Sequence, residues 1–365
     1  MSTADTPARR WVVGDRDPSW SCPVPDEAAQ LFHRTLEDYA PTPLLELPEL
    51  ARELGVGSVV AKDESTRLGL PAFKALGASW AVHRALEAAG RRPDAEVVTA
   101  TDGNHGRAVA HFARAAGRRA RIMVPAGGVH PSAVAAIRAE GAEVVEVDGS
   151  YDQTVRTAAA YSAQQHGVLV QDTAWDGYEE VPGWIVEGYA TLFREIDAQL
   201  HDAGQRSPDL LLVPTGVGSL LQAALAHHRC RSSPGSTAVV SVEPDAAACI
   251  GPSLMAGHPV TVETGSTIMS GLNCGTPSSL AWPLIRDGLD AAVTVSDQGA
   301  IDAAHRLAAL GVEAGPCGAA SLAGAREVLT GEGEQARRRH LGLGPDSVVV
   351  LMITEGVEAN PVPVA

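Results

Sequence analysis

Short apolar strands alternate with helices along most of this chain, and that alternation restricts its fold more than any other feature. Residues 97–100 are a predicted strand, a helix is predicted over 104–116, and the next strand is predicted at 121–124. Because buried strands joined by helices pair through crossover connections, the pattern predicts an open parallel sheet with right-handed crossovers. It predicts further strands at 143–147, 168–171, 210–213, 238–242 and 347–353.

The chain is long enough to form two lobes of this α/β class. It has 365 residues, of which 45% are hydrophobic and only 4% aromatic. We expect a smaller lobe over residues 81–178 and a larger lobe built from 1–80 and 179–365. Neither a low-complexity linker nor an internal repeat is evident in the sequence.

Charge and hydropathy exclude several classes of partner. The formal net charge of -16 argues against general binding to nucleic acid or to an anionic membrane. No apolar run approaches the length that spans a bilayer. An anionic ligand would therefore need a local site, and we expect a small molecule as the partner.

The cysteines predict a reducing compartment. The chain has five, and they form no closely spaced pair of the kind that binds metal: Cys22, Cys230, Cys249, Cys274 and Cys317. An odd number without such spacing favours reduced thiols and no metal site. The first ten residues lack the apolar core of a signal peptide, so we expect a cytoplasmic protein.

Three glycine-bearing segments carry the chemistry of the sequence. They are 72–77 (AFKALG), 101–106 (TDGNHG) and 214–219 (PTGVGS). The amine of Lys74 can hold an aldehyde as a Schiff base, and a glycine loop that opens a helix can hold a phosphate. Pyridoxal phosphate carries both groups on one ring, so these segments together predict this cofactor. Lys74 alone would be a solvated surface lysine.

The segment Gly216-Val217-Gly218-Ser219 has two other interpretations. It is compatible with a plain strand-to-helix turn. It is also compatible with a dinucleotide site, since Glu243 ends the next predicted strand, where an acid would bind a ribose. Leu221 replaces the third glycine of that fingerprint, which weakens the dinucleotide interpretation.

Two aspartates follow predicted strand ends. Asp102 lies in the second glycine-bearing loop, and Asp172 follows the strand predicted at 168–171. The backbone N–H groups of that loop suit a substrate carboxylate, and the Asn104 amide suits a ring hydroxyl. Two carboxylates at one sheet edge favour acid–base chemistry. The alternative is that both aspartates cap helices.

The residues around Lys74 resemble the cofactor-lysine region of diaminopropionate ammonia-lyases, pyridoxal-phosphate enzymes of the tryptophan-synthase-β fold type. The resemblance covers about residues 30–357, and its most discriminating part is the pair Asp102 and Asp172, since related serine and threonine dehydratases have a small residue at the position of Asp102. The other matching segments are 62–65 (KDES), 67–70 (RLGL), 171–173 (QDT), 177–178 (GY), Trp184, 188–189 (GY), 269–272 (MSGL) and 274–275 (CG).

The resemblance implies a role for each matching residue. Lys74 would bind the cofactor covalently beside Phe73, and Asn104 would contact the ring oxygen. Thr354 would face the ring nitrogen. The phosphate would lie on Gly216, Val217, Gly218 and Ser219, and the substrate on Thr101, Asp102, Gly103 and His105. Three residues depart from the pattern: Pro71, Thr215 and Cys317.

The activity implied is elimination of ammonia from 2,3-diaminopropionate, giving pyruvate and a second ammonia. Asp172 or Lys74 would take the Cα proton of one enantiomer and Asp102 that of the other. A homodimer is also implied. The alternatives are a serine/threonine dehydratase-like or β-replacement enzyme, a non-catalytic amino-acid-binding protein, and an NAD dehydrogenase.

Overall fold

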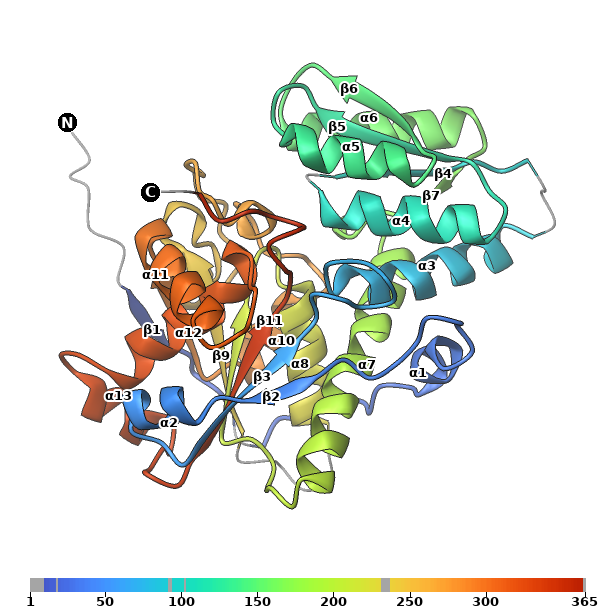
Figure 1. The fold of residues 1–365 in the computed structure, drawn as a ribbon. Coiled ribbons are helices and arrows are strands. Elements are labelled where there is room, and N and C mark those ends of the chain that lie inside the picture. The colour runs from blue at the N-terminus through green and yellow to red at the C-terminus, as the bar shows by residue number, and fades with distance from the viewer. Residues whose placement is uncertain (1–9, 18, 91–93, 102, 231–236, 364–365) are drawn as a thin grey trace, which may run out of the picture.

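Two sheets of different size organise the chain. The computed structural model describes residues 10–363, apart from 18, 91–93, 102 and 231–236. The larger sheet has seven strands in the order β1-β10-β9-β8-β11-β3-β2, and the smaller has four in the order β6-β5-β4-β7 (Figure 1). The expected two-lobed α/β architecture with parallel sheets is confirmed.

The larger sheet is parallel in its interior and antiparallel at both edges. The edge strands are short and partly exposed, whereas the inner ones are almost continuous apolar runs, as buried parallel strands require. In sheet order, its strands are β1 (Trp11–Val13), β10 (Ala291–Val295), β9 (Ala238–Pro244), β8 (Leu210–Pro214), β11 (Val348–Ile353), β3 (Ser58–Asp63) and β2 (Leu44–Glu46).

The smaller sheet is parallel throughout. Its strands are β6 (Glu143–Val147), β5 (Ala120–Pro125), β4 (Val97–Ala100) and β7 (Val168–Leu169). All of them lie within the lobe predicted over 81–178, although the exact lobe boundaries stay a prediction. Strand β7 is shorter than predicted, because the Gln171 N–H donates to the Tyr178 hydroxyl (2.9 Å) and not to a neighbouring strand.

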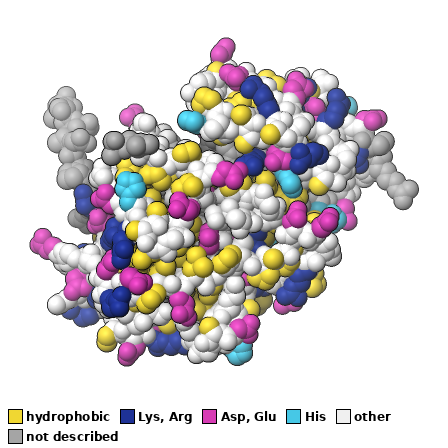
Figure 2. Space-filling view, in the orientation of Figure 1, with side chains coloured by type: hydrophobic (Ala, Val, Ile, Leu, Met, Phe, Trp, Pro, Cys, Tyr) yellow, Lys and Arg dark blue, Asp and Glu magenta, His cyan; other side chains and the backbone are white. Residues whose placement is uncertain are grey.

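Helices surround both sheets. They are α1 (Ala28–His33), α2 (Pro48–Leu54), α3 (Lys74–Ala88), α4 (Asn104–Ala115), α5 (Pro131–Ala139), α6 (Tyr151–Gln164), α7 (Glu180–Asp202), α8 (Ser219–Arg229), α9 (Ile250–Ala256), α10 (Trp282–Gly288), α11 (Asp297–Ala308), α12 (Pro316–Leu329) and α13 (Glu334–His340). Among the described residues, no helix is long and apolar enough to cross a membrane. Acidic and basic side chains are interspersed over the face seen in Figure 2.

Helix α3 joins the two lobes, because it packs against α4 on one side and α7 on the other (Figure 1). Glycines allow α3 and α7 to approach closely. A Cβ atom on Gly77 would lie 2.6 Å from the Tyr189 ring, and one on Gly188 would lie 2.6 Å from the Leu76 carbonyl oxygen. Only glycine fits such contacts without backbone movement. This crossing fixes the start of α3, where Lys74 lies.

A buried cluster of charged side chains supports the same region. The Lys62 Nζ donates to Glu195 Oε2 (2.7 Å), and Arg67 Nη2 donates to the same oxygen (2.7 Å). Arg67 also donates to both carboxylate oxygens of Glu64. These four side chains are almost inaccessible to solvent. Burial raises the pKa of Glu195. Its hydrogen bonds with Arg67, together with the positive charges of Arg67 and Lys62, outweigh burial and hold that pKa below its ordinary value.

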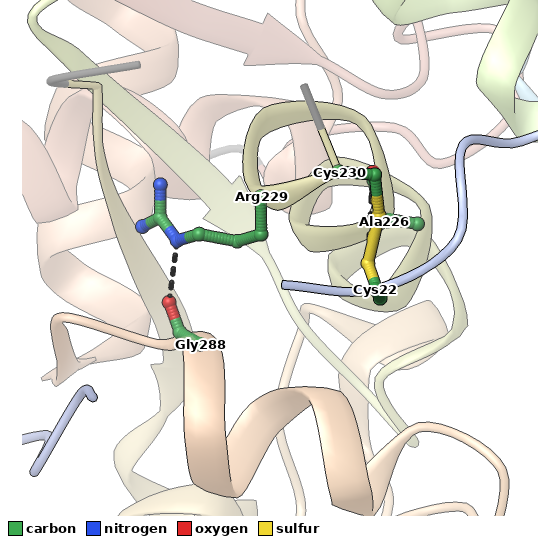
Figure 3. The surroundings of a disulfide bond; sticks show 5 residues. All are labelled: Cys22, Ala226, Arg229, Cys230 and Gly288. Atoms are coloured by element: carbon green, nitrogen blue, oxygen red, sulfur yellow. Dashed lines mark hydrogen bonds between the residues drawn. A yellow bond between two sulfur atoms is a disulfide. The ribbon is translucent and has the colours of Figure 1, made fainter. Parts of the chain in front are cut away.

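One expectation about the cysteines is wrong. Cys22 and Cys230 form a disulfide across 208 residues of sequence, with their Cα atoms 4.8 Å apart (Figure 3). The remaining cysteines are thiols: Cys249, Cys274 and Cys317. The bond links the segment before α1 to the end of α8. Sequence spacing gave no sign of this pair, because the fold brings the two residues together.

We predict that Glu195→Ala strongly destabilises the protein. The change leaves Lys62 and Arg67 buried with too little negative charge, which costs about 3–5 kcal/mol in comparable buried pairs. Urea unfolding at neutral pH measures the difference, and the loss should shrink as pH falls through the lowered pKa of Glu195, where the native carboxylate itself becomes protonated. Glu146→Ala is the control, because its 3.8 Å pair with Arg138 is exposed and should contribute little.

Candidate active site

A cavity of about 920 Å³ lies between the two lobes. Its wall contains residues at or just beyond the carboxyl ends of strands in both sheets, including Pro125 at the end of β5, Asp172 after β7 and Thr354 after β11. Ligands of open α/β sheets bind at this edge. The two sheets therefore present their strand ends to one shared cavity.

Lys74 and Asp172 form an ion pair inside this cavity. The Lys74 Nζ lies 2.7 Å from Asp172 Oδ2, and 5.6 Å from the centre of the Phe73 ring. Burial raises the pKa of Asp172, but the Lys74 ammonium outweighs burial and holds that pKa well below its ordinary value. Gln171 Nε2 donates to the other carboxylate oxygen (3.2 Å). The pair joins the start of α3 to the small sheet.

The segment from Gly216 to Ser219 also lines the cavity. Gly218 has φ +102°, a left-handed conformation that side chains rarely adopt, and α8 begins at the next residue. A Cβ on Gly216 would lie 3.0 Å from Cys274 Sγ. The backbone can therefore approach an anion closely, with the positive end of an eleven-residue helix directed at it. This geometry fits a phosphate.

Glu243 does not serve as a ribose ligand. It is fully buried, and its carboxylate accepts hydrogen bonds from the backbone N–H groups of Cys249 (2.7 Å), Ile250 (2.8 Å) and Gly251 (3.2 Å). All three donors belong to the start of α9. A carboxylate used in this way is not available to a ribose, so the dinucleotide interpretation loses its acidic residue.

The Thr101 side chain stabilises the backbone of the loop at 101–106. The Thr101 hydroxyl accepts hydrogen bonds from the N–H groups of Gly103 (3.0 Å) and Gly106 (2.9 Å), and the side chain is buried. Gly103, Asn104 and His105 line the cavity. The predicted site residue Asp102 lies outside the described residues. The N–H groups at the start of α4 remain suited to a substrate carboxylate.

Thr354 lies at the end of β11 with its side chain in the cavity wall. Its Oγ1 is buried and has no hydrogen-bond partner among the described residues. A buried hydroxyl without a partner is uncommon and indicates a ligand atom at that position. Together with Lys74 and the glycine segment, this atom fits a pyridine ring that carries an aldehyde and a phosphate.

The structure adds two residues that the sequence had not marked as site residues. Tyr189, on α7, lines the cavity next to Phe73, with 4.7 Å between their rings, and burial raises the pKa of its phenol to about 12. Glu355 accepts a hydrogen bond from Asn104 Nδ2 (2.6 Å). Burial raises the pKa of Glu355 despite its hydrogen-bond donors. In the sequence, the only sign that Glu355 belongs to the site is its position next to Thr354.

Comparisons with known proteins identify the family of the chain. The family described as pyridoxal-phosphate dependent enzymes matches residues 35–355. The diaminopropionate ammonia-lyase of Escherichia coli is 36% identical over 360 residues, which cover 90% of this chain and 87% of that protein.

Two solved structures are also similar. One is the E. coli diaminopropionate ammonia-lyase in complex with an aminoacrylate-PLP azomethine reaction intermediate, at 34% identity and a TM-score of 0.86 over 95% of this chain and 94% of that one. The other is the T.th. threonine deaminase, at 26% identity and a TM-score of 0.73 over 90% of this chain and 97% of that one.

We predict that Gly218→Asp weakens cofactor binding. The change adds a negative charge where the phosphate is expected and a side chain where φ is +102°. Titration of the purified variant with pyridoxal phosphate measures the affinity. Gly257→Asp is a matched control, since Gly257 also has a positive φ but a Cβ there would have nothing within 4 Å, and the residue lies outside the cavity wall. Equal affinities for the two variants would show that the phosphate does not bind at Gly218.

Proposed function

The chain belongs to the pyridoxal-phosphate dependent enzyme family, and on that premise we propose that it eliminates ammonia from 2,3-diaminopropionate. The observation that carries the proposal is the Lys74–Asp172 pair in the cavity between the sheets. The overall products are pyruvate and two molecules of ammonia. One ammonia derives from the β-amine, and the other from hydrolysis of 2-aminoacrylate.

Different residues of the cavity would bind different parts of the cofactor. Lys74 would hold its aldehyde carbon, and Phe73 would lie beside it. Gly216, Val217, Gly218 and Ser219 would hold the phosphate, Asn104 the ring oxygen and Thr354 the ring nitrogen. When bound, pyridoxal phosphate withdraws electrons from Cα and so makes the Cα proton removable.

Asp172 is placed to act on the substrate. With the substrate carboxylate on the N–H groups at Asn104 and His105, Asp172 Oδ2 takes the Cα proton of the L enantiomer. We assign the opposite face, and the D enantiomer, to Asp102. As the Cα–H electron pair forms the Cα–Cβ double bond, the Cβ–N bond breaks and its electrons leave with nitrogen.

The leaving group favours aspartates in this site. Ammonia departs readily only when the β-amine is protonated. A carboxylate nearby stabilises that cation, because an opposite charge within several ångströms favours the charged form of an amine. A dehydratase, which expels a hydroxyl group, has no such need. A serine/threonine dehydratase-like or β-replacement activity is the second candidate, since the fold is shared with a threonine deaminase.

We also propose a homodimer in the cytoplasm. The absence of a membrane-spanning helix in the described residues is compatible with that location. The Cys22–Cys230 disulfide is the observation to be reconciled with it, because cytosolic proteins keep most thiols reduced. Light scattering of the purified protein tests the oligomeric state, and thiol labelling in intact cells tests the redox state of that pair.

Lys74→Ala is expected to abolish turnover of diaminopropionate and the visible absorption of the bound cofactor. The fold should survive, because the Lys74 side chain is 21% exposed and lies at the cavity wall. Ammonia and 2-oxo acid assays, with near-ultraviolet circular dichroism as the folding control, measure both effects. Retained visible absorption would mean that another lysine holds the cofactor.

Asp102→Asn and Asp172→Asn are expected to lose different enantiomers. Positioned acid–base catalysis contributes about 10²–10⁴-fold, so Asp172→Asn should lower kcat for the L substrate by that order and Asp102→Asn that for the D substrate. Steady-state kinetics with each enantiomer measures the losses, and L-serine in the same assay tests the dehydratase alternative. Equal losses for both enantiomers would favour a single-base mechanism.

A further inference from the structure

The imidazole of His105 is buried next to Asp172 and has one nitrogen without a hydrogen bond. His105 is 2% exposed. Its Nε2 lies 2.8 Å from the Val170 carbonyl oxygen, which can only accept, so Nε2 carries the proton. Nδ1 has no hydrogen-bond partner among the described residues and lies 3.9 Å from Asp172 Oδ2.

This arrangement contributes little while Asp172 is ionised. Burial lowers the pKa of His105, more than the Asp172 carboxylate raises it, so the ring is neutral and Nδ1 presents a lone pair. That lone pair faces a carboxylate oxygen, which also has only lone pairs. The negative charge of Asp172 is balanced by Lys74 instead, at 2.7 Å.

The arrangement changes when Asp172 carries a proton. A protonated carboxyl group donates a hydrogen bond, and His105 Nδ1, 3.9 Å from Asp172 Oδ2, is an acceptor without a partner among the described residues. The two atoms must approach by about 1 Å to reach an ordinary O–H···N distance. Val170 holds the ring in the required tautomer.

We propose that His105 is a positioning residue for Asp172, whose protonated form it stabilises by accepting a hydrogen bond at Nδ1. The inference rests on the proposed function, in which Asp172 takes the Cα proton of the L substrate. The hydrogen bond makes Asp172 a stronger base than a carboxylate paired only with a lysine. No atom other than the Cα proton is transferred in this step.

Other titratable groups also face Asp172. They are Lys74 from α3, Tyr189 from α7 and Tyr178 from the segment after β7. Burial raises the pKa of Tyr189 to about 12 and that of Tyr178 further, so both phenols stay neutral across the working pH range. Lys74, through its charge, and His105, through the lone pair on Nδ1, are therefore the described groups that affect the basicity of Asp172.

Two substitutions separate the functions of the two ring nitrogens. In His105→Gln, the side-chain amide reaches the position of Nε2 and can still donate to Val170, but nothing replaces Nδ1. In His105→Asn, the shorter amide places an oxygen near the position of Nδ1, where it can accept from Asp172, while the bond to Val170 is lost. The variants form a matched pair.

The test is the pH dependence of kcat/KM for each enantiomer of 2,3-diaminopropionate. For His105→Gln, we expect the L substrate to lose about tenfold, with the acid limb of its profile shifted down by about one pH unit. The acid limb moves to lower pH because His105→Gln removes the group that stabilises protonated Asp172, so this carboxyl group loses its proton more readily. His105→Asn should keep more of the L activity, and the D substrate should show no shift of its acid limb in either variant.

A second measurement does not depend on turnover. Nitrogen NMR of the ¹⁵N-histidine-labelled enzyme should show a His105 signal, identified by its loss in His105→Gln, with an unprotonated Nδ1. In Asp172→Asn that signal should move, because the new amide N–H can donate to Nδ1. A protonated Nδ1 in the resting enzyme would overturn the proposal.

The kinetic outcomes distinguish the failures. If the wild-type enzyme releases no ammonia from either enantiomer, the proposed function itself fails. If wild type is active and both His105 variants lose both enantiomers equally, without any shift in the acid limb, His105 is only a structural residue. If His105→Gln keeps the wild-type profile, the Nδ1 contact has no part in the reaction.

Discussion

The ion pair between Lys74 and Asp172 is the interaction on which the site depends, because it connects the two sheets at their shared edge. Its two side chains are only 21% and 11% exposed, so each charge offsets part of the cost of burying the other. Lys74 is fixed by the close crossing of α3 and α7, and Asp172 by the amide of Gln171. The position of the reactive amine is thus a result of helix packing in one lobe and of a strand end in the other.

Buried polar groups in this chain differ in how their hydrogen bonds are satisfied. Glu243 is buried as deeply as any residue of the cavity, but three backbone donors satisfy its carboxylate and it stabilises the start of α9. Thr354 Oγ1 and His105 Nδ1 have no such partners among the described residues. Since burying a polar atom without a partner costs free energy, atoms of this kind are retained where a ligand or a reaction step supplies the missing partner.

The sequence predicted many of the elements whose signal is local, although it did not predict the inner strands β3 and β10. Strands β4, β6 and β8 are rich in valine or leucine, and each was expected within one residue of its observed bounds. The edge strands β1 and β2 were not expected, because three residues carry no periodicity and depend on pairing with a distant partner. The Cys22–Cys230 disulfide was not predicted for the same reason, because the two cysteines are 208 positions apart in the sequence. The roles assigned to individual site residues remain predictions.

Local motifs and long-range contacts also determine different parts of the proposed chemistry. The lysine segment and the glycine segment are each contiguous, and each fits one part of the cofactor by itself, which is why the sequence alone indicates the cofactor. The basicity of Asp172 depends instead on Lys74, 98 residues away, and on His105. A related chain that kept both motifs but altered these contacts would still bind the cofactor, yet would differ in the proton it removes and in the group it expels. On the proposed mechanism, substrate choice is therefore decided by the polar side chains that the two sheets bring together.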